Sequence, residues 1–260
     1  MPASDPITVE AQDAVAFVTI DRPESRGAMT RDMWLALPAR LEQAVAIAGV
    51  RVVVIRGTAG NFISGADIKE FERLRSDPGL AREYDRGAES TLETLAGLDV
   101  PSIAEIGGPC VGGGCLIASG CDLRVASDAA SFGIPAGRLG LAYPYPALER
   151  IVAILGEARA LELALTGRVI DAEEAARIGL VHTHTTVSDL TETVRKLADA
   201  IAANAPLALR YLRLAIRRHS KSAVDGDRIK ELAAACFESD DYREGIAAFL
   251  EKRRPRFSGL

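Results

Sequence analysis

The sequence predicts an α/β fold, with strands concentrated in the first half of the chain and helices in the second. Runs of apolar and β-branched residues that are typical of strands lie at 14–20, 52–55, 102–106 and 122–126. A helical pattern between the first two runs indicates parallel pairing through crossover connections. After Tyr145, helical patterns dominate.

Composition and charge are those of an ordinary soluble globular protein. Of the 260 residues, 48% are hydrophobic and 26% are charged, and the net charge of −5 weighs against nucleic-acid binding. No apolar run approaches a membrane span, and the N-terminal residues lack a secretory signal pattern, so no membrane partner is expected. The four cysteines suggest reduced thiols in the cytoplasm. They lack zinc-finger spacing, and no metal site is expected.

The individual elements follow from caps, turns and apolar spacing. A polar turn over 21–27 follows the first strand, and Thr30 is the predicted N-cap of a helix that runs to about Ala48. A glycine-punctuated loop over 57–68 follows the second strand, and charged helical segments extend over 69–98. The helices predicted for the second half are 146–155, 157–165, 172–178, 190–204, 206–219, 228–238 and 241–252.

The stretch from Ile103 to Asp122 organises the rest of the chain. An extended apolar segment runs into Gly112, Gly113 and Gly114, and a short apolar run follows. Glycine permits a sharp turn and lets another molecule approach the main chain closely. Where such a turn opens a helix, backbone N–H groups point outward at the positive end of the helix dipole. An oxygen that carries negative charge can be held there.

A second junction of this kind lies at Phe62–Glu70, which reads FISGADIKE. A strand ends, Gly65 bends the chain, and a helix begins near Asp67, so a backbone N–H near Ala66 is exposed. Two junctions that follow two strands of one sheet can converge on one oxygen. Paired backbone donors of this kind stabilise an enolate or a tetrahedral oxyanion.

Together, the two junctions resemble the crotonase superfamily, also called the enoyl-CoA hydratase/isomerase family. The resemblance extends over nearly the whole chain. The other segments that resemble the family are Asp21–Pro23 with Ala28–Met29, Leu165–Gly167, Ala172–Ala176, Gly179–Val181 and Phe249–Pro255.

This resemblance implies a spiral of ββα units that forms an acyl-CoA-binding core over residues 1–200. A helical region over 201–260 would drive assembly into a homotrimer or a dimer of trimers. The substrate would be an acyl-CoA thioester, with coenzyme A as part of the substrate and no separate cofactor. The implied activity is that of a lyase or isomerase in fatty acid metabolism.

The resemblance also implies roles for particular residues. The N–H groups of Ala66 and Gly113 would donate hydrogen bonds to the thioester carbonyl oxygen. The residues expected to contact the substrate or line the CoA channel are Arg26, Ala28, Ser64, Asp67, Ile68 and Lys69. Lys252 or Arg253, on the last helix, would approach a CoA phosphate from a neighbouring subunit, or would simply be a solvated helix end.

The chain departs from the family's hydratases, which use two glutamates to handle water. The position directly after the Gly-Gly-Gly-Cys element is Leu116, and the position after the proline of Phe132–Pro135 is Ala136. Neither side chain transfers protons, and loss of a positioned acid or base costs roughly 10²–10⁴-fold in rate. We therefore expect an enzyme of this class that stabilises a thioester enolate without the two-glutamate hydration machinery.

Tyr143 is the best side-chain candidate for chemistry. It would orient a leaving carboxylate or protonate carbon, or its ring would only fill space. The Leu-Gly-x-x-Tyr turn resembles the methylmalonyl-CoA decarboxylase branch, although that branch has a histidine where this chain has Ala66. Leu116, Ala136 and Leu141 would form an apolar pocket that disfavours a carboxylate. The alternatives are a decarboxylase of a malonyl-type CoA thioester and a non-catalytic acyl-CoA-binding protein.

Other polar residues are candidates for a chemical role. Glu105, on the strand that leads into the glycine element, is a reserve acid or base. His182 and His184 share one face of an expected strand, which suggests either a metal pair or an exposed strand. No serine has a histidine partner at a recognisable nucleophile elbow, so a hydrolase triad is not expected.

Overall fold

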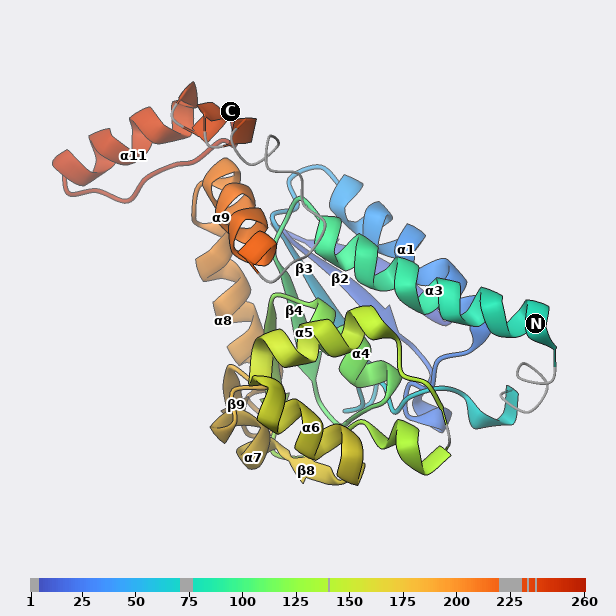
Figure 1. Cartoon of the computed structure of the whole chain (residues 1–260). Helices are drawn as coiled ribbons and strands as arrows, with labels where there is room; N and C mark the ends of the chain where they lie inside the picture. The colour runs from blue at the N-terminus through green and yellow to red at the C-terminus, as the bar shows by residue number, and fades with distance from the viewer. Residues whose placement is uncertain (1–4, 71–76, 140, 220–230, 233, 237) are drawn as a thin grey trace.

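A six-stranded sheet lies at the centre of the fold in the computed structural model (Figure 1). The structure describes residues 5–70, 77–139, 141–219, 231–232, 234–236 and 238–260. The sheet order is β1 (Ile7–Gln12), β2 (Val15–Ile20), β3 (Val52–Gly57), β4 (Ser102–Ile106), β6 (Leu123–Ser127) and β9 (Thr183–Thr185). β1 and β2 are antiparallel, and the later neighbours are parallel. A smaller sheet joins β5 (Pro109–Val111), β7 (Ser131–Gly133) and β8 (Val169–Asp171).

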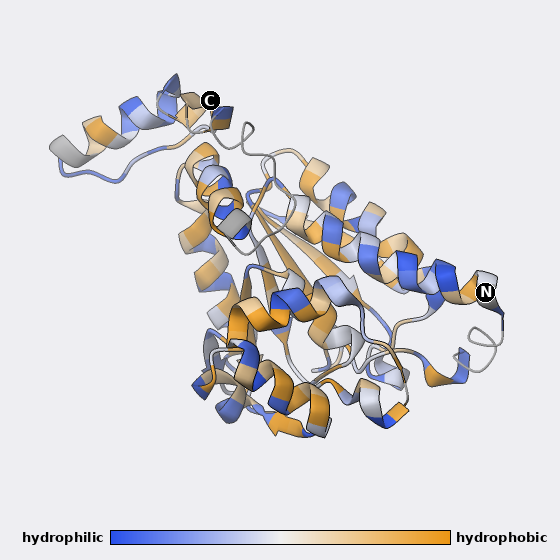
Figure 2. Cartoon of the chain, in the orientation of Figure 1, coloured by the Kyte–Doolittle hydropathy of each residue, from blue (hydrophilic) through white to orange (hydrophobic). Residues whose placement is uncertain are grey.

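Helices cover both faces of the large sheet because its strands are apolar on both sides (Figure 2). On β3, Val53 and Ile55 point into the larger core, whereas Val52 and Val54 point into a second core under α8 (Leu190–Ala202). The helices around the larger core are α1 (Arg31–Ala46), α3 (Pro78–Gly97), α4 (Gly113–Gly120), α5 (Tyr145–Leu155), α6 (Glu157–Thr166) and α7 (Ala172–Arg177).

The predicted α/β class and the four predicted strands are confirmed. Thr30 caps α1 as expected, since its side chain accepts a hydrogen bond from the N–H of Met33. The edge strand β1 was not predicted, although its alternation of Ile7, Val9 and Ala11 with polar residues is typical of a half-buried strand. The short strands β5, β7 and β8 were also missed, because three residues are too few for a period to appear. β9 falls where His182 and His184 were expected to lie on a strand.

The helices of the second half also follow the prediction, with ends that differ by one or two residues. α9 (Pro206–His219) matches its predicted range, and α11 (Asp240–Leu250) begins one residue early and ends two residues early. Much of the predicted helix at 228–238, and residues 71–76 of the predicted helical segment at 69–98, lie outside the described residues.

The C-terminal part of the described chain projects from the body. In Figure 1, α9 lies beside α8, and α11 extends away from the sheet. The last residues fold back along α11, where the Asp241 carboxylate accepts hydrogen bonds from the N–H groups of Ser258 and Gly259. The predicted division after residue 200 falls near the end of α8, and the division itself stays a prediction. Within the described part of the chain, no helix has the length and apolar character needed to cross a membrane.

Candidate active site

The first junction, around Ala66, exposes a backbone donor by its pairing with Met29. The N–H of Met29 donates to the carbonyl of Gly65 at 2.8 Å, and the N–H of Asp67 donates to the carbonyl of Met29 at 2.9 Å. In a parallel bridge of this form, the flanking residues make both hydrogen bonds, and the central residue directs its own N–H to the opposite side. The N–H of Ala66 is therefore turned away from Met29.

The second junction is the N-terminus of α4. Gly112 is its N-cap, with a φ of 52° that favours glycine, and no side chain caps the helix. The first helical hydrogen bond runs from the N–H of Leu116 to the carbonyl of Gly112 at 3.0 Å. The N–H groups of Gly113, Gly114 and Cys115 consequently have no partner within the helix.

The two junctions lie against each other because glycine leaves no side chain between them. Ile63 and Cys110 form a parallel bridge, and the N–H of Val111 donates to the carbonyl of Ile63 at 3.1 Å. A Cβ on Gly114 would stand 2.0 Å from the Ile63 oxygen. A Cβ on Gly113 would stand 3.8 Å from the carbonyl carbon of Gly65. The chain can thus bring the main chain of both loops to one place.

A pocket of about 300 Å³ opens beside these loops. The main chain of both junctions lines this pocket, whose surface is largely apolar. Its lining includes eight of the residues singled out from the sequence, namely Ser64, Ala66, Ile68, Gly113, Leu116, Ala136, Leu141 and Tyr143. Leu116 is almost fully buried within α4, and Ala136 lies in a short 3-10 helix (Pro135–Leu139) on the facing wall.

The other predicted site residues do not line this pocket. Asp67 accepts a hydrogen bond from the Arg22 guanidinium at 3.0 Å, and the same guanidinium donates to the carbonyl of Ala28 at 2.7 Å. The carbonyl of Arg26 accepts from the N–H of Ser64 at 3.1 Å. Asp67, Ala28 and Arg26 therefore stabilise the first junction through hydrogen bonds outside the pocket lining. Lys69 is exposed beside it.

Lys252 lies apart from these residues. It is exposed and follows the end of α11, in the part of the chain that projects from the body (Figure 1). A contact between Lys252 and a ligand in a pocket of this kind would require a neighbouring copy of the chain. Its predicted role therefore stays a prediction.

One wall of the pocket comes from α1 and α3, which sequence reasoning did not connect with the site. The indole N–H of Trp34 donates to the hydroxyl of Tyr84 at 2.8 Å, and the two rings meet nearly edge to face. A Cβ on Gly113 would stand 2.8 Å from the Trp34 ring, so this ring presses directly on the second junction. Asp85 and Ala88 continue the wall. The only available signal was that Trp34 is the single tryptophan of the chain.

Tyr143 lines the pocket, and its hydroxyl has a specific partner. It donates to the carbonyl of Gly112 at 2.8 Å, which ties the tyrosine turn to the second junction. Burial raises the pKa of Tyr143 well above its ordinary value, and the nearby Cys115 and Cys110 thiols act in the same direction. The phenol is therefore neutral at physiological pH and acts here as a hydrogen-bond donor.

Glu105 does not reach the pocket. It lies on the same face of β4 as Ile103, toward α8, and one of its carboxylate oxygens accepts from the Thr191 hydroxyl at 2.8 Å. The reserve assignment of Glu105 as an acid or base is therefore not supported by its position. Nδ1 of His182 accepts from the N–H of Arg124 at 3.2 Å. Among the described residues, no group of three or more His, Cys, Asp or Glu side chains could hold a metal ion.

The fold and the two glycine junctions are shared with a family of known proteins. A sequence profile of the Enoyl-CoA hydratase/isomerase family matches residues 10–259. The chain belongs to this family, which is the crotonase superfamily.

Curated relatives and a solved structure extend the comparison. The short-chain-enoyl-CoA hydratase of Clostridium acetobutylicum is 32% identical over 251 residues, 95% of each chain. The crotonyl-CoA hydratase of Syntrophomonas wolfei is 31% identical over 258 residues, 98% of each chain. The crystal structure of an enoyl-CoA hydratase/carnithine racemase from Magnetospirillum magneticum superimposes with a TM-score of 0.92 at 36% identity, covering 99% of this chain and 97% of that one.

Proposed function

We propose that this pocket binds an acyl-CoA thioester and stabilises its enolate. The observation that carries the proposal is the meeting of two glycine junctions that leave the N–H groups of Ala66 and Gly113 without partners in their own elements. Donors fixed in a largely apolar pocket stabilise developing negative charge without having to reorient during the reaction. The similarity to enzymes named enoyl-CoA hydratases supports the choice of a CoA thioester.

The ordinary hydration route lacks its acid and base in this proposal. Leu116 and Ala136 occupy the two positions at which the family's hydratases are expected to carry glutamates, and both line the pocket. Asp85 is the one carboxylate among the described lining residues, and it stands on α3 rather than at either of those positions. Enolate stabilisation is therefore the part of the family chemistry that these residues support.

The remaining predicted roles complete the proposal. The CoA moiety would leave the pocket past Ile68 and Lys69, both exposed at its edge. Lys252 of a neighbouring copy would approach a CoA phosphate. The assembly would be a homotrimer or a dimer of trimers in the cytoplasm. No cofactor beyond the CoA of the substrate is invoked.

A second candidate reaction is decarboxylation of a malonyl-type CoA thioester. The observation that favours it is the apolar surface formed by Leu116, Ala136 and Leu141 in a pocket that keeps its backbone donors. Such a surface solvates a carboxylate poorly. The carbon–carbon bond would break to release CO₂, its electron pair would pass into the thioester enolate, and a proton would then be added to the α-carbon. No general base is needed for the first step.

Single-turnover experiments separate these possibilities. The protein is mixed with crotonyl-CoA and, separately, with methylmalonyl-CoA, while enoyl absorbance and CO₂ release are followed. We expect both thioesters to bind and hydration of crotonyl-CoA to be slow. Fast hydration would refute our interpretation of Leu116 and Ala136. Binding without either product would favour a non-catalytic acyl-CoA-binding protein, and absence of binding would refute the proposal altogether.

Tyr143→Phe tests whether the hydroxyl takes part in any turnover found. It removes the hydrogen bond to the Gly112 carbonyl but keeps the ring. We expect a loss of about 0.5–1.5 kcal/mol in stability, because one partly buried hydrogen bond is lost. A fall in turnover of about tenfold or more would support a role in proton delivery or loop placement. Unchanged turnover would show that Tyr143 only lines the pocket and that its hydroxyl takes no part in the reaction.

A further inference from the structure

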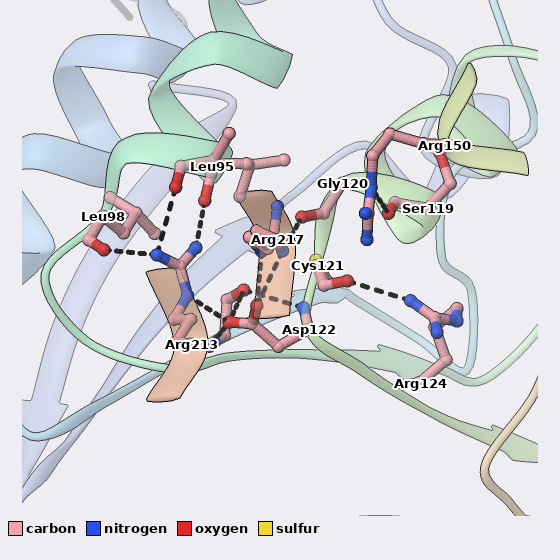
Figure 3. A network of polar contacts seen from close by, with 12 residues as sticks. Leu95, Leu98, Ser119, Gly120, Cys121, Asp122, Arg124, Arg150, Arg213 and Arg217 are labelled. Carbon is pink, nitrogen blue, oxygen red and sulfur yellow. Dashed lines mark hydrogen bonds and ion pairs between the residues drawn. The ribbon is translucent and has the colours of Figure 1, made fainter. Parts of the chain in front are cut away.

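Arginines from three elements converge on the carboxyl end of α4 (Figure 3). Arg124 on β6 donates to the carbonyls of Ala118 and Cys121 at 3.1 and 2.9 Å. Arg217 on α9 donates to the carbonyl of Gly120 at 2.6 Å. Arg150 on α5 makes a longer contact of 3.4 Å with the carbonyl of Ser119. The carbonyls of the last turn of α4 have no partners within the helix, and they accept hydrogen bonds from these guanidinium groups instead.

Asp122 joins this cluster to α9. Its carboxylate accepts from the Nε atoms of Arg213 and Arg217 at 2.7 and 2.8 Å, and from both the N–H and the hydroxyl of Ser102. Burial by itself would raise the pKa of Asp122, but the two guanidiniums outweigh it and hold the pKa below its ordinary value. Arg213 also donates to carbonyls at the end of α3, namely those of Leu95, Ala96 and Leu98.

The opposite end of the same helix is the second junction of the candidate site. α4 has eight residues, and all of them except Gly113 are buried. Eight residues span about 12 Å, so a helix of this size moves as one rigid body. A shift or rotation at Gly120 therefore reaches Gly113 almost undiminished. A hydrogen-bond donor that is displaced by a fraction of an ångström loses much of its effect on developing charge.

We infer that Arg124 and Arg217 are positioning residues that set the placement of the Gly113 N–H through α4. The inference rests on the proposed function, in which that N–H polarises a thioester carbonyl. The cationic cluster also compensates the negative end of the α4 dipole, so that it does not oppose the anion at the other end. α9, in the predicted assembly region, thereby contributes to the chemistry of a pocket that it does not line.

The test is isotope-edited infrared spectroscopy of butyryl-CoA that carries ¹³C at its thioester carbonyl. In the wild-type protein, the carbonyl band is expected to fall below its frequency in water, because hydrogen bonds weaken the C=O bond. Arg217→Lys and Arg124→Lys keep the positive charge but lose the planar set of donors. Each is expected to lose about half or more of the wild-type band shift, while the Kd for butyryl-CoA changes less than about threefold.

Arg210→Lys is the matched control. Arg210 lies on α9 as well, but its ion pair at 2.8 Å joins it to Asp99, in the loop between α3 and β4, and not to α4. This variant should keep the wild-type band. A wild-type band in folded Arg217→Lys and Arg124→Lys proteins would overturn the inference.

Folding and the parent proposal are checked separately. Circular dichroism and urea unfolding establish which variants are folded. If Arg217→Lys or Arg124→Lys does not fold, the infrared band of Arg150→Lys, which alters the weakest contact of the cluster, is measured in its place. A wild-type protein that binds butyryl-CoA without any band shift would overturn the proposed function, and the inference with it. That result is distinct from a normal wild-type shift that the variants retain.

Discussion

At the residue scale, glycine determines how closely the two junctions approach. Of the glycines in the two junctions, Gly114 tolerates a side chain least, because a Cβ there would stand 2.0 Å from the Ile63 carbonyl oxygen. That neighbour is main chain, and it is held by the bridge between Ile63 and Cys110, so it cannot move aside cheaply. The requirement for glycine here is steric and does not depend on the reaction.

Gly114→Ala should therefore destabilise the protein by about 3 kcal/mol or more, at the upper end of the cost of overpacking. The measurement is the free energy of unfolding in urea. Gly97→Ala is the control, because a Cβ there meets nothing within 4 Å and the residue ends α3. It should be neutral or slightly stabilising, within about 1 kcal/mol. Equal losses in the two variants would contradict the steric argument.

The absence of acids at the pocket can be reversed by substitution. Leu116→Glu combined with Ala136→Glu should raise hydration of crotonyl-CoA at least about 100-fold, because positioned acids and bases contribute about 10²–10⁴-fold. The double variant with glutamine at both positions has the same size but cannot transfer a proton, and it should stay at the wild-type rate. Equal rates in the two double variants would show that the pocket does not present these side chains to substrate.

The junction residues could be identified from the sequence, whereas the pocket wall formed by Trp34 and Tyr84 could not. Ala66 and Gly113 could be singled out because glycine after a strand leaves a local pattern. Trp34 and Tyr84 stand 50 positions apart and meet only after α1 and α3 have packed, so their contact leaves no local trace. The partner of the Tyr143 hydroxyl, the Gly112 carbonyl, was equally out of reach, since a main-chain acceptor is not visible in side-chain types.

At the element scale, the carboxyl end of α4 combines buried charge with helix termini. The Asp122 carboxylate lies between Arg213 and Arg217 in Figure 3 and forms an ion pair with each of them. A carboxylate that folding holds in its charged form stabilises the protein above its ordinary pKa of 3.8. That contribution is lost as the pH falls through the lower pKa of the folded state.

Asp122→Asn should cost about 3–5 kcal/mol at pH 7, because it leaves two buried guanidiniums without their carboxylate. The difference from wild type should begin to shrink below about pH 4, where the carboxylate of the unfolded chain takes up a proton, and should be lost at the lower pH where the folded-state carboxylate is protonated. Urea unfolding at several pH values measures both effects. Asp99→Asn removes the more exposed pair with Arg210 and should cost about 1 kcal/mol or less. A pH-independent difference would contradict this account.

Elements with a long periodic pattern were predictable, and short or edge elements were not. α8 and α9 show strong apolar periodicity, so their ranges were found nearly to the residue. β1 was overlooked despite its alternating pattern, and it pairs with β2 across a tight turn at Asp13, a residue with positive φ. The alternation of Val52 to Ile55 between two cores was hidden, because a strand buried on both faces shows no polar side.

At the scale of the whole molecule, exposed apolar residues occur on two helices of the C-terminal region. Ile216 on α9 is 70% exposed and Ile246 on α11 is 47% exposed. The predicted trimer would cover such residues, and burial of apolar surface is the main driving force of stable association. The α/β class and the family were predictable because they depend on patterns spread along the chain. The assembly was not, since it depends on surfaces that meet between chains.

Light scattering should give three or six chain masses for the wild-type protein at micromolar concentration. Ile216→Asp combined with Ile246→Asp should shift the protein toward single chains, because buried unpaired carboxylates oppose association. Leu165→Asp is the control, since Leu165 is 81% exposed but lies on α6. A monomeric wild type, or equal dissociation by the control, would contradict the assignment of the interface.

The two donors proposed for the candidate site belong to the main chain, and this affects how the protein can be studied. An alanine scan would leave Ala66 unchanged, because this residue is already alanine. At Gly113 or Gly114, alanine would clash with neighbouring atoms, so the measured loss would reflect the clash and not the loss of a hydrogen-bond donor. Replacing the amide of either donor by an ester, through chemical ligation, removes one hydrogen and leaves every side chain in place. Screens that vary side chains alone would find the residues that choose the reaction and overlook the groups that make it possible.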